Sequence, residues 1–191
     1  MSCLLFDLAI EPLAASIWKS ELRGFSDIPG VEEKLITSLF ADDTTVFLNE
    51  EDKLEDLEKI LDQWCMALTA VFNIAKTQIL PIRKKEYRLR IIADRRAIPE
   101  QRQIPEHIHV AVEGEAIRIL GAWYGYEVHE GTAWANQLEK IDKSLENWDK
   151  SNPTMDGRKK IVQMVVGGMT QYLTQVQGMP KSIEKKLQKR I

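Results

Sequence analysis

The sequence predicts an α+β fold, in which antiparallel β-hairpins pack on helices and a helical region follows. Three observations support this prediction. Residues 34–49 hold two β-branched, apolar runs around a short acidic turn, which is typical of a hairpin. Residues 108–125 repeat that pattern, and residues 49–72, 134–148 and 161–176 space their apolar residues as helices do. With 191 residues and 44% hydrophobic content, the chain can bury one large core or two small ones.

The first element expected is an amphipathic helix that runs to about Ser20. It ends before the segment RGFSDIPG, whose Gly and Pro residues favour a turn. Because the sequence enters this helix at once, without a cap or a leading turn, we expect it to begin inside a larger domain. The apolar stripe of the helix consists of Leu4, Leu5, Leu8, Ile10, Leu13 and Ile17.

The first hairpin has KLITSLF as one strand, Ala41-Asp42-Asp43 as its turn, and TTVFLN as the returning strand. An acidic helix is expected within residues 49–72. The segment FNIAKTQILPI then favours a loop that leads into a short strand, which Pro81 closes. The apolar face of the acidic helix consists of Leu54, Leu57, Ile60, Leu61, Trp64 and Leu68.

The second half of the chain predicts a hairpin and two helices. Residues 83–106 are polar and basic, and we expect a linker or an insertion there. Residues 108–125 predict the second hairpin, with Glu113–Gly114 at its turn. The next helix places Trp134, Leu138, Ile141, Leu145 and Trp148 on one face. The last, after Pro153, places Ile161, Val165, Val166, Met169, Tyr172, Leu173 and Val176 on another.

Composition excludes several classes of protein. The net charge of −3 indicates neither a basic nucleic-acid module nor a disordered acidic tail. The charge is segregated, however: residues 50–62 are acidic, whereas residues 83–102 and the end of the chain are basic. Such segregation suits a protein that holds a polyanion in some places, although solvated helix faces give the same pattern.

Membrane and redox signals are weak. No apolar run approaches the roughly 18 residues needed to span a bilayer, so we expect no membrane partner. Cys3 and Cys65 lack metal-ligand spacing and indicate no disulfide framework. A reducing, intracellular compartment is the default, and the sequence leaves the exact location and the oligomeric state open.

Asp42 and Asp43 form the most informative pair of residues. Asp is common in turns, so a polar hairpin tip is one interpretation. The turn has no Gly, however, and apolar strands flank it. Adjacent carboxylates repel each other unless they are solvated or share a cation. Carboxylate oxygens suit Mg²⁺, and a two-metal site can drive the transfer of a phosphoryl-type group.

Phe40-Ala41-Asp42-Asp43, between two strands, resembles the catalytic hairpin of reverse transcriptases. The order of the surrounding motifs resembles the polymerases of non-LTR (LINE-type) retrotransposons. SCLLFDLAIEPLAASI is similar to the helix after the family's template and nucleotide contact loop, with Cys3 in place of the usual Pro. FNIAKTQILPI is similar to the next motif, and IRILGAWYG to the Leu-Gly hairpin that grips the primer end. DGRKKIVQMVVGGMTQYLTQV is similar, less closely, to a thumb segment.

The resemblance implies a partial polymerase palm over residues 1–128 and a helical, thumb-like segment over residues 129–191. It also implies that Asp42 and Asp43 bind Mg²⁺, Asp42 as the bridging ligand and Asp43 as a weaker one. Lys76 is then expected near the pyrophosphate end of an incoming deoxynucleoside triphosphate, as a cation and proton donor. A solvated loop lysine is the ordinary alternative for Lys76.

The resemblance also implies contacts to an RNA template and a DNA primer. Leu120 and Gly121 are expected to press on the primer strand, because Gly allows a close backbone approach. Arg158, Lys159 and Lys160 are expected to contact phosphates without reading the sequence.

One departure from the family limits the expected activity. The family's first catalytic carboxylate lies upstream of the first matched motif, and no residue among 1–41 takes its place. We therefore expect a fragment of a reverse transcriptase, whose parent performs template-directed DNA synthesis and which is inactive by itself. A non-catalytic nucleic-acid-binding remnant and a poorly folded relic are the alternatives.

Overall fold

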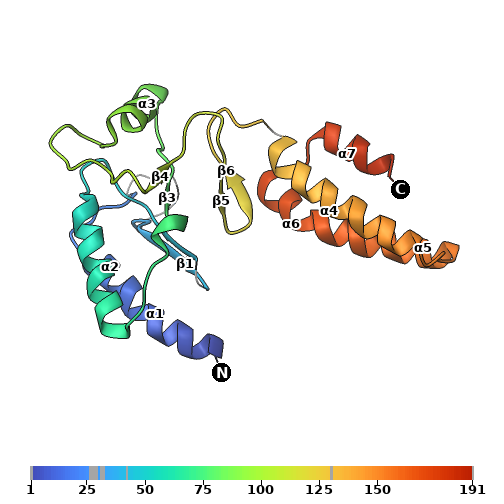
Figure 1. Ribbon diagram of the computed structural model, residues 1–191, viewed down its shortest axis with the longest axis horizontal. Coiled ribbons are helices and arrows are strands. Elements are labelled where there is room, and N and C mark those ends of the chain that lie inside the picture. The colour runs from blue at the N-terminus through green and yellow to red at the C-terminus, as the bar shows by residue number, and fades with distance from the viewer. Residues whose placement is uncertain (1, 26–29, 31–32, 42, 130, 191) are drawn as a thin grey trace. The chain divides into compact units, whose positions relative to one another are not determined.

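The computed structural model describes residues 2–25, 30, 33–41, 43–129 and 131–190 (Figure 1). The chain divides into two compact units, Met1–Val112 and Glu113–Ile191. Each unit combines helices with short antiparallel or parallel strand pairs, which confirms the predicted α+β class. The second unit begins at Glu113, before the β-hairpin of residues 117–124. The family resemblance instead divides the chain into palm and thumb after residue 128.

In the first unit, two helices and a hairpin enclose one core. α1 (Ser2–Lys19) packs on α2 (Leu54–Leu68), and β1 (Thr37–Phe40) pairs with β2 (Asp43–Val46) in antiparallel register. The indole Nε1 of Trp64 donates to a backbone carbonyl of α1 at 3.0 Å, which joins the two helices. The core consists of Ile10, Leu13, Ile17, Leu22, Ile36 and Leu57.

The expected stripe on the first helix is only partly buried. Its second half, from Ile10 onward, faces the core as predicted. Its first half does not, because Leu4, Leu5 and Leu8 are each about two-thirds exposed. The apolar spacing of this helix therefore continues beyond the surface that the first unit covers.

A buried carboxylate joins two loops of the first unit. Asp52 is only 7% exposed, and it accepts three backbone hydrogen bonds. The N–H groups of Arg23, Gly24 and Asn49 donate to it at 2.8, 2.9 and 2.8 Å. The segment after α1 and the segment before α2 are thus held by a single side chain.

The segment 83–106 is folded, although the sequence favoured a linker or an insertion. It contains α3 (Lys85–Asp94). Arg95 follows this helix, and its guanidinium donates to the carbonyls of Ile104, Pro105 and Ile108. The buried residues of α3 are Arg88 and Ile91, so the helix carries too little apolar periodicity to be predicted.

The remaining elements of the first unit are short. η1 (Ile74–Lys76) is one 3₁₀ turn, and β3 (Gln78–Ile79) follows it after Thr77. β3 pairs in parallel with β4 (His109–Val110). The sequence predicted a strand close to β3 but not this pairing, because it assigned the residues of β4 to the second hairpin.

The turn of the second hairpin was predicted at Glu113–Gly114, and this is wrong. β5 (Ile117–Ile119) pairs with β6 (Ala122–Tyr124), and Leu120 and Gly121 connect them. Both connecting residues have positive φ, 49° and 85°. A left-handed leucine is uncommon, so turn rules point away from this position.

Helices form most of the second unit. α4 (Gly131–Asp149) packs on a long segment made of α5 (Met155–Val162), a π-helical turn (Gln163–Gly167) and α6 (Gly168–Gln177). α7 (Lys181–Gln188), which the sequence analysis did not predict, also packs on α4. The core consists of Ala133, Trp134, Leu138, Ile141, Val165, Val166, Leu173, Ile183 and Leu187.

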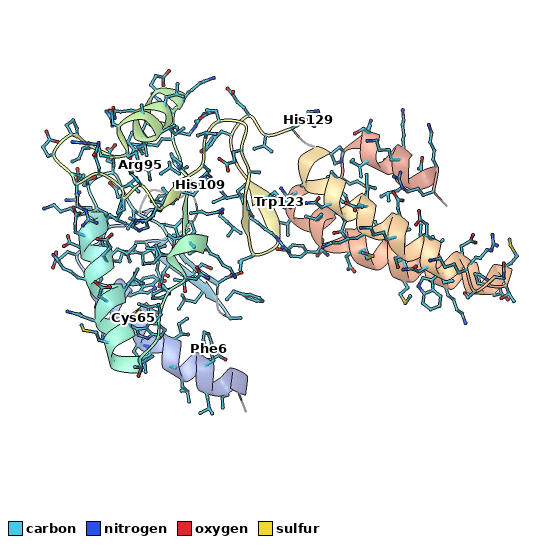
Figure 2. All side chains as sticks on the ribbon, in the orientation of Figure 1. Phe6, Cys65, Arg95, His109, Trp123 and His129 are labelled. Atoms are coloured by element: carbon cyan, nitrogen blue, oxygen red, sulfur yellow. The ribbon has the colours of Figure 1, made fainter. Side chains whose placement is uncertain are left out.

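The hairpin of this unit is attached to α6 by polar contacts. The side-chain amide of Gln177 forms hydrogen bonds with both backbone groups of Trp123 in β6 (Figure 2). A neighbouring β-strand would pair with the same two groups. Its Oε1 accepts from the Trp123 N–H at 3.1 Å, and its Nε2 donates to the Trp123 carbonyl at 2.7 Å. The Tyr172 hydroxyl donates to the carbonyl of Leu120 at the turn. The β5–β6 turn is therefore held against α6.

Candidate metal and nucleic-acid site

The first hairpin places Asp43 at the end of a strand pair. Phe40 and Asp43 are directly opposite each other in the antiparallel register. Ala41, which follows Phe40, has a left-handed backbone with φ of 50°. Asp42, the expected bridging ligand, lies outside the residues that the structure describes. The predicted strand–turn–strand arrangement is confirmed for the described residues on both sides of it.

The side chain of Asp43 lies on the hairpin face that points away from the core. Leu39 and Val46 share the opposite face and pack against the core of the first unit. Because side chains alternate along a strand, Asp43 shares its face with Phe40, which is 67% exposed. Asp43 is also exposed, and no described residue forms an ion pair with it. An accessible carboxylate of this kind fits a single oxygen ligand for Mg²⁺.

A complete metal site is not visible in the described part of the chain. Among those residues, no three His, Cys, Asp or Glu side chains gather closely enough to hold an ion. Asp42 is outside this comparison, so the metal role of Asp42 and Asp43 stays a prediction.

Lys76 is the last residue of η1, and its side chain is exposed. The backbone fixes this turn, because the Lys76 N–H donates to the carbonyl of Asn73 at 2.9 Å. No hydrogen bond or ion pair among the described residues joins Lys76 to Asp43. The structure therefore places both in the first unit without a polar interaction between them, and the phosphate role of Lys76 remains a prediction.

The Leu120–Gly121 turn has a structural role that the sequence did not show. A Cβ atom added at Gly121 would lie 3.2 Å from Cε1 of Tyr172. The small residue therefore permits close packing on α6 and the left-handed φ of 85°. Leu120 remains 39% exposed, so a contact with a primer strand is sterically open but untested.

We expect Gly121→Ala to lower the free energy of unfolding of residues 113–191 by about 1–2 kcal/mol, because alanine is strained at this φ. Gly168→Ala is the matched control. Gly168 lies in α6, and an added Cβ there would meet no atom within 4 Å. That variant should be neutral or more stable by up to about 1 kcal/mol. Urea denaturation measures both, and equal effects would contradict the steric role of Gly121.

The predicted phosphate contacts are exposed on α5. Thr154 caps this helix, because its hydroxyl accepts from the Gly157 N–H at 3.2 Å. Arg158 forms an ion pair with Asp149 of α4, in which Nη2 and Oδ1 are 3.7 Å apart. Lys159 and Lys160 form no ion pair with any described residue. Consecutive helical residues are about 100° apart, so the three cations spread around the helix. They supply positive charge but no single flat binding face.

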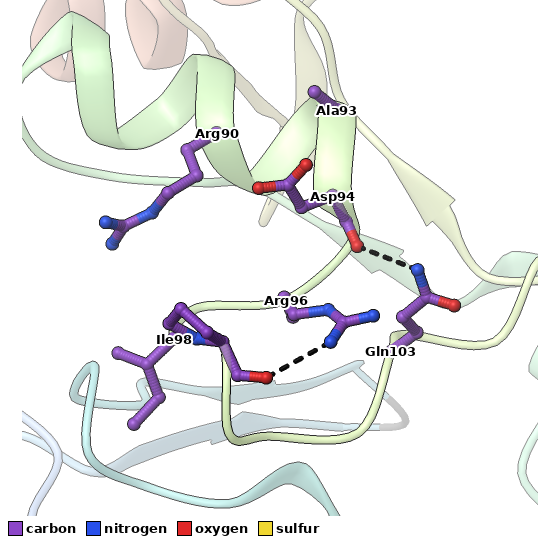
Figure 3. Close-up of a pocket in the computed structure, with 7 residues that line it drawn as sticks. Arg90, Ala93, Asp94, Arg96, Ile98 and Gln103 are labelled. Atoms are coloured by element: carbon purple, nitrogen blue, oxygen red, sulfur yellow. Dashed lines mark hydrogen bonds between the residues drawn. The ribbon is translucent and has the colours of Figure 1, made fainter.

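A pocket of about 300 Å³ lies between α3 and the loop after it (Figure 3). Arg96 donates to the carbonyl of Pro99 at 3.1 Å, and Gln103 donates to the carbonyl of Asp94 at 3.2 Å. Arg90 donates to the carbonyl of Ala97 at 2.9 Å. These polar side chains therefore hold the loop in place. The sequence missed the pocket because its residues lie in the segment expected to be a linker or an insertion.

No protein-family model matches the chain, and no curated protein or solved structure matches it either. Within the described segments, no helix combines the length and the apolar character that crossing a membrane requires. The structure thus shows an α+β protein of two compact units.

Proposed function

We propose that the chain is a fragment of a reverse transcriptase of the non-LTR retrotransposon type. The parent reaction is template-directed DNA synthesis. In that reaction a primer 3′-hydroxyl attacks the α-phosphate of a deoxynucleoside triphosphate, the bond to the leaving pyrophosphate breaks, and one nucleotide is added. In this proposal residues 1–128 correspond to part of the palm and residues 129–191 to the start of the thumb.

The observation that carries the proposal is the hairpin that ends in Phe40 and Asp43. Its strands are paired in antiparallel register, one face packs against the core, and Asp43 is accessible on the other face. An accessible carboxylate on such a scaffold, next to a second acid in the sequence, is a suitable place for a divalent ion, because carboxylate oxygens are preferred ligands of Mg²⁺.

The proposed roles follow from the charge of each side chain. Mg²⁺, when bound, would lower the pKa of the attacking hydroxyl and stabilise the leaving oxygen. Asp42 and Asp43 would hold the ion, and Lys76 would balance the negative charge at the pyrophosphate end. The family uses a further carboxylate, upstream of the first matched motif, as a metal ligand. Without it the set of metal ligands is incomplete, so residues 1–191 should not catalyse the reaction.

Paramagnetic Mn²⁺ provides a direct test of the metal site. We expect trace Mn²⁺ to broaden the backbone amide resonances of residues 40–46, because the relaxation effect falls steeply with distance. Asp42→Asn should abolish most of this broadening, and Asp43→Asn should reduce it. Asp56→Asn, which alters an exposed acid on α2, is the control and should leave it unchanged. Equal broadening of the resonances near Asp56 and near Asp43 would show that Mn²⁺ binds exposed carboxylates without preference for the hairpin.

Primer extension tests the expected lack of activity. Purified residues 1–191 should add no nucleotide to a primed RNA template in Mg²⁺. If the wild type incorporates nucleotides and the Asp42→Ala variant does not, the chain is catalytically complete. That result would contradict the expected lack of activity but not the proposed relation to reverse transcriptases.

A non-catalytic nucleic-acid-binding remnant is the second candidate function. It is favoured by the charge of the second unit, where residues 113–191 hold twelve Lys and Arg against ten Asp and Glu. The remaining residues, 1–112, hold fourteen against nineteen. Binding of a primed template that weakens steeply as salt rises, with no Mn²⁺ effect at the hairpin, would select this function over the first.

A further inference from the structure

We infer that one face of α7 binds the phosphate backbone of a nucleic acid. Lys181 and Lys185 lie on this face, Lys189 at the C-cap of α7 continues it, and we refer to the three as the lysine ridge. The inference rests on the proposed nucleic-acid partner, and it assigns the main contact to a helix other than α5.

The spacing of the three lysines aligns them. They recur every four residues, so they lie along one side of α7 at intervals of about 6 Å. All three are exposed. The opposite side of the helix carries Ile183 and Leu187, which are 2% and 5% exposed. The ammonium groups must therefore point away from the core and into solvent.

The ridge is held in place before any partner arrives. Ile183 and Leu187 belong to the core of the second unit, which fixes the rotation of α7 about its axis. Arg190, just beyond the helix, forms an ion pair with Asp142 of α4, with Nη2 and Oδ2 2.9 Å apart. A partner therefore needs to order only the lysine side chains, which lowers the entropic cost of binding.

No described residue neutralises the ridge. Glu184 is the one acidic residue of α7, and it forms no ion pair with the three lysines in the part of the chain that the structure describes. The lysines on α4 differ, since Lys143 pairs with Glu139 at 2.7 Å. The unpaired charge on α7 is therefore available to an external anion.

A phosphodiester backbone fits the ridge better than a membrane surface does. A basic helix that binds a membrane inserts its own apolar face into the lipid. The apolar face of α7 is already buried in the protein core. Lysine ammoniums in a row match the regular negative charge of a backbone, and they contact it as point charges without reading bases.

The experiment compares two triple variants of the full chain that lose the same charge. The first is Lys181→Gln, Lys185→Gln, Lys189→Gln, and the control is Lys140→Gln, Lys143→Gln, Lys150→Gln around α4. Fluorescence anisotropy of a labelled, primed RNA–DNA template gives the affinity of each at several salt concentrations. We expect the ridge variant to bind about tenfold more weakly and to lose about 2–3 from the slope of log K against log salt. The control should lose clearly less of both.

Each outcome is decisive. If the wild type binds but the two triples weaken binding equally, the ridge inference is overturned and the proposed function stands. If the wild type binds no nucleic acid at low salt, the nucleic-acid part of the proposed function fails, and the ridge inference with it. Tighter binding to phosphatidylserine vesicles than to the template also overturns the ridge. A Lys→Arg triple, which preserves charge, should retain binding even where the Gln triple folds poorly.

Discussion

Replacing Asp52 by alanine is expected to lower the free energy of unfolding of residues 1–112 by about 3–5 kcal/mol. Asp52 is buried and accepts hydrogen bonds from the N–H groups of Arg23, Gly24 and Asn49. Alanine leaves these donors without an acceptor, and each unsatisfied buried donor costs about 1–3 kcal/mol. Urea denaturation measures the loss, and hydrogen exchange at these three amides should locate it.

Asp56→Ala is the matched control for Asp52. Asp56 is exposed on α2, and its partner is Lys59 at 2.8 Å. The hydrogen bond from Lys59 lowers the pKa of Asp56, yet solvent screens exposed pairs of this kind, so the alanine variant should lose little stability. If the two alanine variants lose the same stability, Asp52 does not hold the loops as described.

Trp134→Ala is expected to destabilise the second unit by about 3–5 kcal/mol. Trp134 is 1% exposed, and it is the bulkiest fully buried side chain among the described residues. Its removal leaves a cavity between α4 and the helices packed on it, which neighbouring side chains fill only partly. Urea denaturation followed by hydrogen exchange should place the loss within residues 113–191.

Trp148→Ala is the control that shows whether the loss of stability comes from the burial of Trp134 or from replacing any tryptophan of this helix. Trp148 lies on the same helix as Trp134 but is 43% exposed. Its truncation should therefore cost about 1 kcal/mol or less. Similar losses for both tryptophans would mean that the core of the second unit is not centred on Trp134.

The sequence predicted those elements whose signals are local. The first hairpin is rich in β-branched and aromatic residues, and its two strands are separated only by a short turn. The helices with Leu57 and Trp134 on their apolar faces repeat such residues over many turns. In both cases the residues that carry the pattern are neighbours in the chain, so pattern and structure agree.

The missed elements depend on contacts between distant residues. β3 and β4 hold two residues each and pair across about thirty intervening residues, so neither shows a strand period. α3 is followed by Arg95, whose guanidinium bonds to backbone carbonyls. α7 has only Ile183 and Leu187 as buried apolar residues, which is too few for a periodic signal.

The candidate site shows the same division. The sequence placed the hairpin correctly but assigned Asp43 to its turn, whereas Asp43 is the first residue of β2 and pairs with Phe40. The docking of Gly121 on Tyr172 could not be predicted, because the two residues are about fifty positions apart and no local rule connects them. The residue types that carry chemistry are visible in a sequence, whereas their neighbours are fixed only by tertiary packing.

The bond between Gln177 and Trp123 also has a consequence for self-association. A two-stranded hairpin has open edges, at which a strand from another molecule can add and begin a stacked aggregate. The Gln177 amide already occupies the outward N–H and C=O groups of Trp123, so that edge cannot template a third strand there. A helix side chain thus protects the hairpin from intermolecular β-addition.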